Sequence, residues 1–160
     1  GGTMAVDLAE ELFWLAQTML PGEAPFPSGG AVGAQAALAV RLVQLHGERG
    51  LERLGLAIEA AGGPLAGRDE AARVAAVAAF ERAEPAFFAD VRRLLYLAYY
   101  ETPLVARAIR ATGLDYNLTP QPRGYALEPF DPARDAPRHG RGRWLRTEEI
   151  ARVSEPAADA

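Results

Sequence analysis

The histidines and the paired acids are the residues of this chain that could perform acid–base or metal chemistry. His46 stands at an expected helix end, where we interpret it as a structural residue beside exposed carbonyls, and His139 lies in an arginine-rich segment. A metal site needs several histidines or carboxylates in register, and two remote histidines do not supply one. Glu10–Glu11 and Glu148–Glu149 are adjacent pairs whose side chains point roughly 100° apart on a helix, so we expect solvated charges.

Nucleophiles and phosphate-binding loops are equally scarce. Ser28 and Ser154 are the two serines, and neither stands in a nucleophile-elbow pattern. The absence of cysteine removes thiolate nucleophiles, iron–sulfur ligation and covalent haem attachment. All 17 basic residues are arginine, which leaves no lysine for a Schiff base or a P-loop. We therefore predict no catalytic residue, no metal site and no cofactor bound by this chain alone.

Composition places the chain among ordinary globular proteins. Its 160 residues suffice for one domain with a core, and 49% of them are apolar. A net charge of −4 does not favour nucleic-acid binding. No apolar run approaches the ~20 residues of a membrane span, and no leader follows Met4, the expected initiator. The expectation is a cytoplasmic protein, with periplasmic co-export beside a partner as the alternative.

The elements that would position any site are helices. Apolar residues recur at close to a 3.6-residue period, and no stretch alternates with a strand period. Proline and glycine punctuate the pattern, most densely in an expected loop over 21–33. The spacing predicts an all-α domain of five or six short helices, over 6–20, 34–45, 51–61, 69–82, 85–100 and 103–112. Thr102 is the expected N-cap of the last of these.

The C-terminal third departs from this helical pattern. From Leu114 to Arg146 the chain is a long irregular ribbon rich in proline, glycine and arginine, yet it carries large aromatic side chains. Long loops of this kind are usually functional or disordered, and disordered tails are poor in aromatics. We predict a helical domain over 4–113 and an extended partner-wrapping tail over 114–160, with a short helix near 147–153.

Three segments together resemble the gluconate 2-dehydrogenase subunit 3 family. The first is Leu15–Pro21 with the following Phe26–Gly33, the second runs from Pro85 to Pro103, and the third is Pro120–Tyr125. Their order matches the family, and the resemblance covers roughly residues 10 to 125. Members of that family accompany a large FAD-containing subunit of the glucose–methanol–choline type, and often a cytochrome subunit. The resemblance implies a non-catalytic role in the stability, folding or export of that partner, with the FAD bound by the partner.

An accessory role requires a docking surface. On the helix over 85–100 two neighbouring apolar stripes indicate core packing, whereas Arg92 and Arg93 should face outward. Between Arg134 and Arg146 five arginines stand against one aspartate, a charge pattern that suits an acidic partner surface. The expected interface residues are Tyr99, Tyr100, Arg123, Tyr125, Phe130, Arg141 and Trp144.

Two other functions stay open. The chain could be a stand-alone helical module that binds a small apolar ligand between alanine-rich helices. It could also be an enzyme that uses tyrosine and arginine with a bound cofactor, although the missing nucleophile and phosphate loop disfavour this. The substrate of any complex would be determined by the partner.

Overall fold

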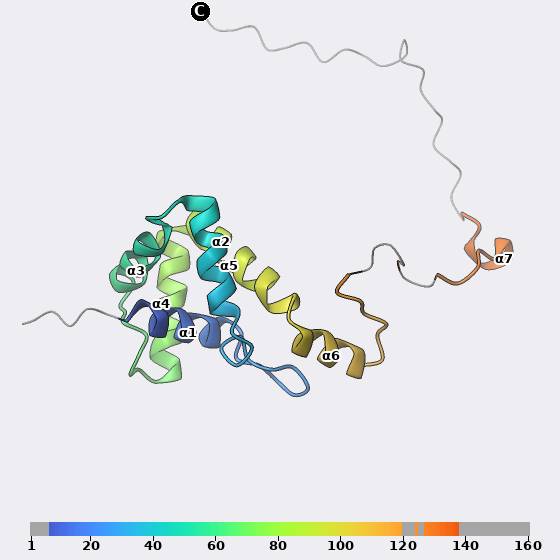
Figure 1. The fold of residues 1–160 in the computed structure, drawn as a ribbon, viewed down its shortest axis with the longest axis horizontal. Coiled ribbons are helices and arrows are strands. Elements are labelled where there is room, and N and C mark those ends of the chain that lie inside the picture. The colour runs from blue at the N-terminus through green and yellow to red at the C-terminus, as the bar shows by residue number, and fades with distance from the viewer. Residues whose placement is uncertain (1–6, 120–123, 125–126, 138–160) are drawn as a thin grey trace, which may run out of the picture. The chain divides into compact units, whose positions relative to one another are not determined.

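The computed structural model describes residues 7–119, 124 and 127–137, and this part of the chain is all-α, as predicted. It contains seven helices and no strand; Glu23 and Phe26 form an isolated bridge. Figure 1 shows the helices, which are α1 (Leu8–Met19), α2 (Ala34–His46), α3 (Gly50–Ala60), α4 (Glu70–Ala83), α5 (Pro85–Tyr100), α6 (Pro103–Ala111) and α7 (Pro132–Asp135).

Local sequence explains most helix ends. The carboxylates of Asp7 and Asp69 cap α1 and α4 by accepting the amides of Ala9 and Ala72 at 3.0 and 2.8 Å. Pro85 and Pro103 occupy first-turn positions, where a missing N–H costs nothing. Thr102 occupies the N-cap position of α6, as expected, but its side chain does not cap the helix. Its hydroxyl donates backward to the Tyr99 carbonyl at 2.8 Å, so α6 begins without a side-chain cap.

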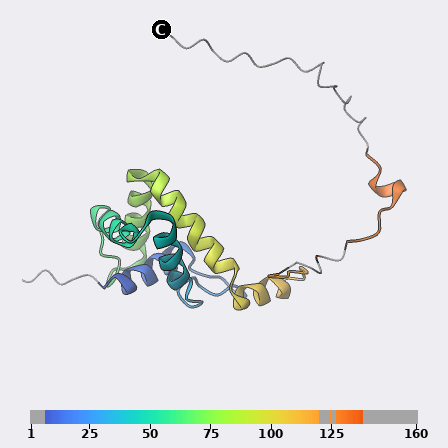
Figure 2. The same cartoon turned by 45° about the horizontal axis from the view of Figure 1, so that its top comes forward.

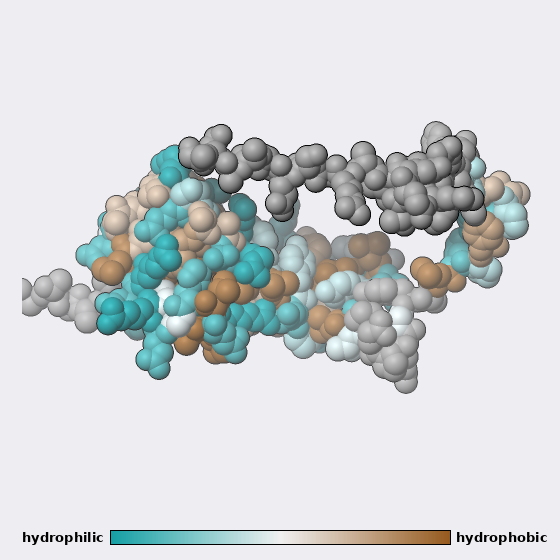
Figure 3. All heavy atoms as spheres, turned by 90° about the horizontal axis from the view of Figure 1, so that it is seen from above, coloured by the Kyte–Doolittle hydropathy of each residue, from teal (hydrophilic) through white to brown (hydrophobic). Residues whose placement is uncertain are grey.

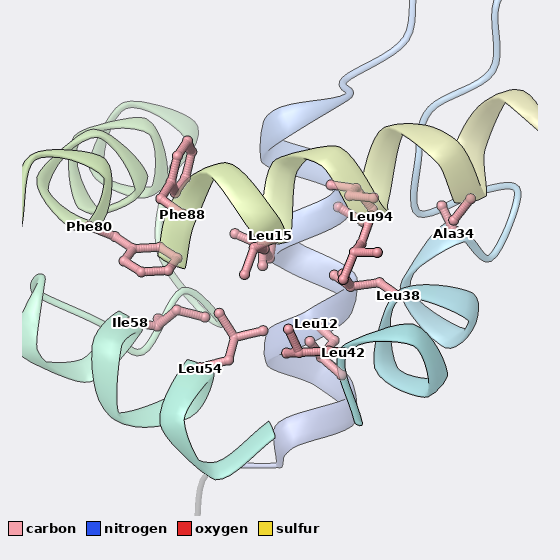
Figure 4. Packing of buried hydrophobic residues seen from close by; sticks show 14 of the residues in the cluster. Leu12, Leu15, Ala34, Leu38, Leu42, Leu54, Ile58, Phe80, Phe88 and Leu94 are labelled. Carbon is pink, nitrogen blue, oxygen red and sulfur yellow. The ribbon is translucent and has the colours of Figure 1, made fainter. Parts of the chain in front are cut away.

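One hydrophobic core lies where α1 to α5 meet. Figure 4 shows side chains from these five helices pointing toward one another, with Leu12 and Leu15 of α1 near the centre. Phe80 packs its ring edge-on against Phe87 and Phe88, with centroid separations of 5.9 and 5.1 Å. Both stripes predicted on α5 are buried: Phe87, Val91, Leu94 and Ala98 in one, Phe88, Leu95 and Tyr99 in the other.

Glu11 corrects the expectation of solvated acids. Its side chain is only 2% exposed, and its two carboxylate oxygens accept the backbone amides of Leu65 and Ala66 at 2.8 and 2.9 Å. A buried carboxylate is tolerated where such bonds replace water. Glu10, one residue earlier, is exposed as expected. Glu11 thus joins α1 to the loop before α4.

The chain divides into two units, residues 1–125 and 126–160. The first unit extends past Gly113, where the tail was expected to start. Arg110 donates to the Tyr116 carbonyl at 3.0 Å, and the Tyr116 hydroxyl lies 3.4 Å from the Tyr100 carbonyl. These contacts attach the chain at Tyr116 to the helical body.

The second unit contains α7, a short helix inside the ribbon that was expected to lack regular structure. Asp131 caps it by accepting the amide of Ala133 at 2.9 Å, and Pro132 follows at the first position. Arg134 pairs with Glu128 and Asp135, and the hydrogen bond from Arg134 lowers the pKa of Asp135. The helix predicted near 147–153 lies outside the described residues.

Candidate functional site

The loop between α1 and α2 forms the base of the candidate site. Gly22 has φ +81°, and a Cβ there would lie 2.6 Å from the backbone nitrogen of Ser28. A Cβ on Gly29 would lie 2.8 Å from the Ala16 carbonyl oxygen, so only glycine lets this loop pack directly on α1. Between them, the backbones of Glu23 and Phe26 exchange hydrogen bonds of 3.1 and 2.6 Å.

Tyr99 fastens this loop to α5. Its hydroxyl donates to the Pro27 carbonyl at 2.7 Å, and its side chain is only 4% exposed. Figure 2 shows the loop passing beside the end of α5. Burial raises the pKa of Tyr99, and the neighbouring Tyr100 raises it further. Tyr99 is therefore a core residue that shapes the site, and it leaves little side chain for a partner.

A groove of 330 Å³ lies where the loop meets the ends of α1 and α5; we call it the tyrosine groove. Its lining residues are Met19, Leu20, Pro21, Gly22, Glu23, Phe26, Tyr99 and Tyr100. The ring of Tyr100 stands edge-on to that of Tyr99 at 5.3 Å and is 47% exposed. The groove is thus mainly apolar and aromatic.

Exposed apolar side chains continue from the rim of this groove. Leu97 and Tyr100 are three residues apart on α5 and share its outer face, while Leu104 follows in the first turn of α6. Leu97 and Leu104 are 46% and 48% exposed. We call Leu97, Tyr100 and Leu104 the α5–α6 strip. Hydrophobic patches interrupt the hydrophilic surface of the helical body in Figure 3 as well.

The structure brings together two of the predicted interface residues, Tyr99 and Tyr100. Phe130 belongs to the second unit, where its side chain is 68% exposed. Arg123, Tyr125, Arg141 and Trp144 lie outside the described residues.

Sequence reasoning missed Leu97, Leu104 and Glu23 as site residues. A signal for Leu97 was available, because the helical period places it on the same outward face as Arg93 and Tyr100. No sequence pattern predicted that Glu23 would line the groove, because it lies in a loop and not on a helix. Its position depends on the turn that it makes with Phe26.

A second groove, of 490 Å³, lies along α3. Its lining residues are Arg49, Glu52, Arg53, Leu56, Ala57, Ala60 and Glu84. The Arg53 guanidinium lies 4.0 Å above the centre of the Phe87 ring and 3.6 Å from the Glu84 carboxylate. Pockets for small apolar ligands carry few charged groups, so this charged groove does not favour the ligand-binding alternative.

His46 contacts side chains of another helix, and not the helix-end carbonyls that were expected as its partners. It is the last residue of α2, and its Nε2 lies 3.0 Å from the Asp90 carboxylate of α5. Its ring also packs edge-on against Phe87 at 5.1 Å. The expected partners were helix-end carbonyls; instead the imidazole links two helices. The expectation for Arg92 and Arg93 is confirmed, since both face outward and pair with Glu81 and Asp90.

Tyr99 gives the first testable prediction. A raised folded-state pKa means that its neutral form stabilises the fold fully below the unfolded pKa of about 10, and this contribution is lost as the pH rises through the folded pKa. We expect the free energy of unfolding of the wild type to fall as the pH rises above about 9, until the pH has passed the folded-state pKa of Tyr99. Tyr99→Phe should flatten that fall, and the exposed control Tyr96→Phe should keep it, as measured by denaturant unfolding. Equal slopes in both variants would contradict the assignment.

No helix among the described residues is both long and apolar enough to cross a membrane. Nor do three or more His, Asp or Glu side chains in that part of the chain gather as metal ligands would. Comparison of the chain with protein-family models, with curated proteins and with solved structures finds no match.

Proposed function

We propose that this chain is a non-catalytic small subunit that docks on a large FAD-dependent oxidoreductase subunit acting on a sugar or an alcohol, and stabilises or matures it. The observation that carries the proposal is the α5–α6 strip beside the tyrosine groove. Residues from two of the segments that resemble the subunit 3 family line this groove, namely Leu20, Phe26 and Tyr100.

Surface energetics support docking at this place. Adjacent exposed apolar side chains mark interaction sites on soluble proteins, because burying them releases ordered water. Aromatic residues at a groove are frequent hot spots, since a rigid ring fills a pocket at small entropic cost. Tyr100 has both properties, and its ring is held by Tyr99, which is itself tied to the loop.

The proposal assigns the redox chemistry to the partner. The FAD belongs there, and a cytochrome subunit is a further candidate member of the complex. This chain then contributes a preformed surface: the glycines of the loop, the Tyr99 hydrogen bond and the packing of α5 on α1 and α2 hold that surface in place without the partner.

The test first asks whether a flavoprotein dehydrogenase is encoded beside this gene. The two proteins are then co-expressed and analysed by size-exclusion chromatography that monitors flavin absorbance. We expect co-elution of the wild-type chain with the flavoprotein. Tyr100→Ala should weaken the complex by roughly 2 kcal/mol, about 30-fold in Kd, because it removes the exposed ring. Leu97→Asp should weaken it at least as much, since it buries a charge.

The matched control is Leu56→Asp, the same change at an exposed leucine of α3. It should leave co-elution unchanged, and circular dichroism should show native helix content in all three variants. Normal co-elution of both Tyr100→Ala and Leu97→Asp would show that this surface is not the docking site.

A further inference from the structure

The tyrosine groove has the properties of a site for a positive charge. We propose that it accepts the side chain of an arginine presented by the partner protein. This inference rests on the proposed function, because it names the chemistry by which the partner would be recognised.

The charge balance of the groove is the first reason. Among the described residues that line it, Glu23 is the one with a charge, and no arginine is present. The Glu23 carboxylate is exposed and has no hydrogen bond or ion pair with any described residue. Glu101, which follows α5, is already paired with Arg41. The groove therefore offers one carboxylate free to pair with a cation.

Two helix ends add to this negative potential. α1 ends at Met19 and α5 ends at Tyr100, and both residues line the groove. The C-terminal end of a helix carries about half a negative charge, which proteins commonly balance with Lys, Arg or His. Neither α1 nor α5 has a basic residue in its last turn. The start of α6 at Pro103 partly balances the end of α5, so a partner cation would mainly balance the end of α1.

The aromatic walls favour arginine over lysine. Phe26 and Tyr100 present rings, and a planar guanidinium stacks on a ring while its N–H groups form a fork onto a carboxylate. The aliphatic stem of the arginine can pack on Met19 and Leu20. This protein already makes such contacts, with Arg53 over Phe87 at 4.0 Å and Arg73 over Trp14 at 4.3 Å.

The experiment uses amide NMR spectra of the isotope-labelled full chain with two peptides, acetyl-Leu-Arg-Leu-amide and the same peptide with citrulline. Citrulline keeps the size of arginine and lacks its charge. We expect the arginine peptide to shift the amides of Gly22, Glu23 and Tyr100, and to bind about threefold to tenfold more tightly than the citrulline peptide. Glu23→Gln should remove most of that difference, and the control Glu59→Gln, at an exposed acid of α3, should preserve it.

Equal affinities for the two peptides, or no shift of these amides at millimolar peptide, would overturn the inference. A second control measures spectra without peptide at several protein concentrations. If the same amides shift with protein concentration, the groove binds a second copy of the chain, and the inference is overturned. The peptide titration needs no flavoprotein, so its failure is separate from that of the proposed function. A flavoprotein complex that depends on Tyr100 would survive a negative titration, and peptide binding would survive the absence of a flavoprotein complex.

Discussion

Phe80→Ala is expected to lower the free energy of unfolding by about 4 kcal/mol, because it removes a large side chain from the centre of the core. Phe80 is 1% exposed and makes edge-on contacts with both Phe87 and Phe88, so the substitution leaves a cavity between α4 and α5. The surrounding side chains can close this cavity only partly, because α4 and α5 are held in place by their packing on α1 and α2. Urea unfolding followed by circular dichroism measures the loss.

The second unit supplies a control with the same chemical change. Phe130 is exposed, so Phe130→Ala removes an identical side chain without creating a cavity. We expect its free energy of unfolding to equal that of the wild type within about 0.5 kcal/mol. A loss below about 1 kcal/mol for Phe80→Ala would mean that this part of the core is loosely packed and collapses around the vacancy.

The helices and the core were predictable because their signals are local. The 3.6-residue period placed seven α5 residues in two buried stripes, and all seven are buried. Prolines and glycines marked the ends of the helices to within about two residues. α7 carried the same kind of signal, Asp131 before Pro132, but it lies inside a proline-rich ribbon whose composition suggested a loop.

The candidate site was only partly predictable, because its residues come from distant parts of the chain. Tyr100 was expected at an interface, yet the groove beside it forms only when the loop over 21–33 folds back to bond with Tyr99. That contact joins residues 72 positions apart. A hydroxyl that needs a hydrogen-bond partner can be read from the sequence, but the partner, the Pro27 carbonyl, cannot.

Glu11 is a charged residue whose partners likewise could not be predicted, because they lie far along the chain. Two adjacent glutamates in the first turn of a helix fit a solvated position near its positive end, and this description suits Glu10. Glu11 differs because the helix turns it toward the amides of Leu65 and Ala66, which lie 54 and 55 residues further along the chain. No local pattern distinguishes the two acids.

Glu11→Ala is therefore expected to lower the free energy of unfolding by about 3 kcal/mol, since it removes two hydrogen bonds to a charged acceptor. The bond to Leu65 is buried, so that amide loses its partner where water does not readily replace it. Glu10→Ala, the same change one residue earlier on the exposed face, should cost no more than about 1 kcal/mol. Urea unfolding of both variants gives the comparison. Hydrogen exchange should also show the Leu65 and Ala66 amides losing protection in Glu11→Ala alone. Equal losses of stability in the two variants would mean that the carboxylate acts through the α1 dipole, and not as the link between α1 and the loop before α4.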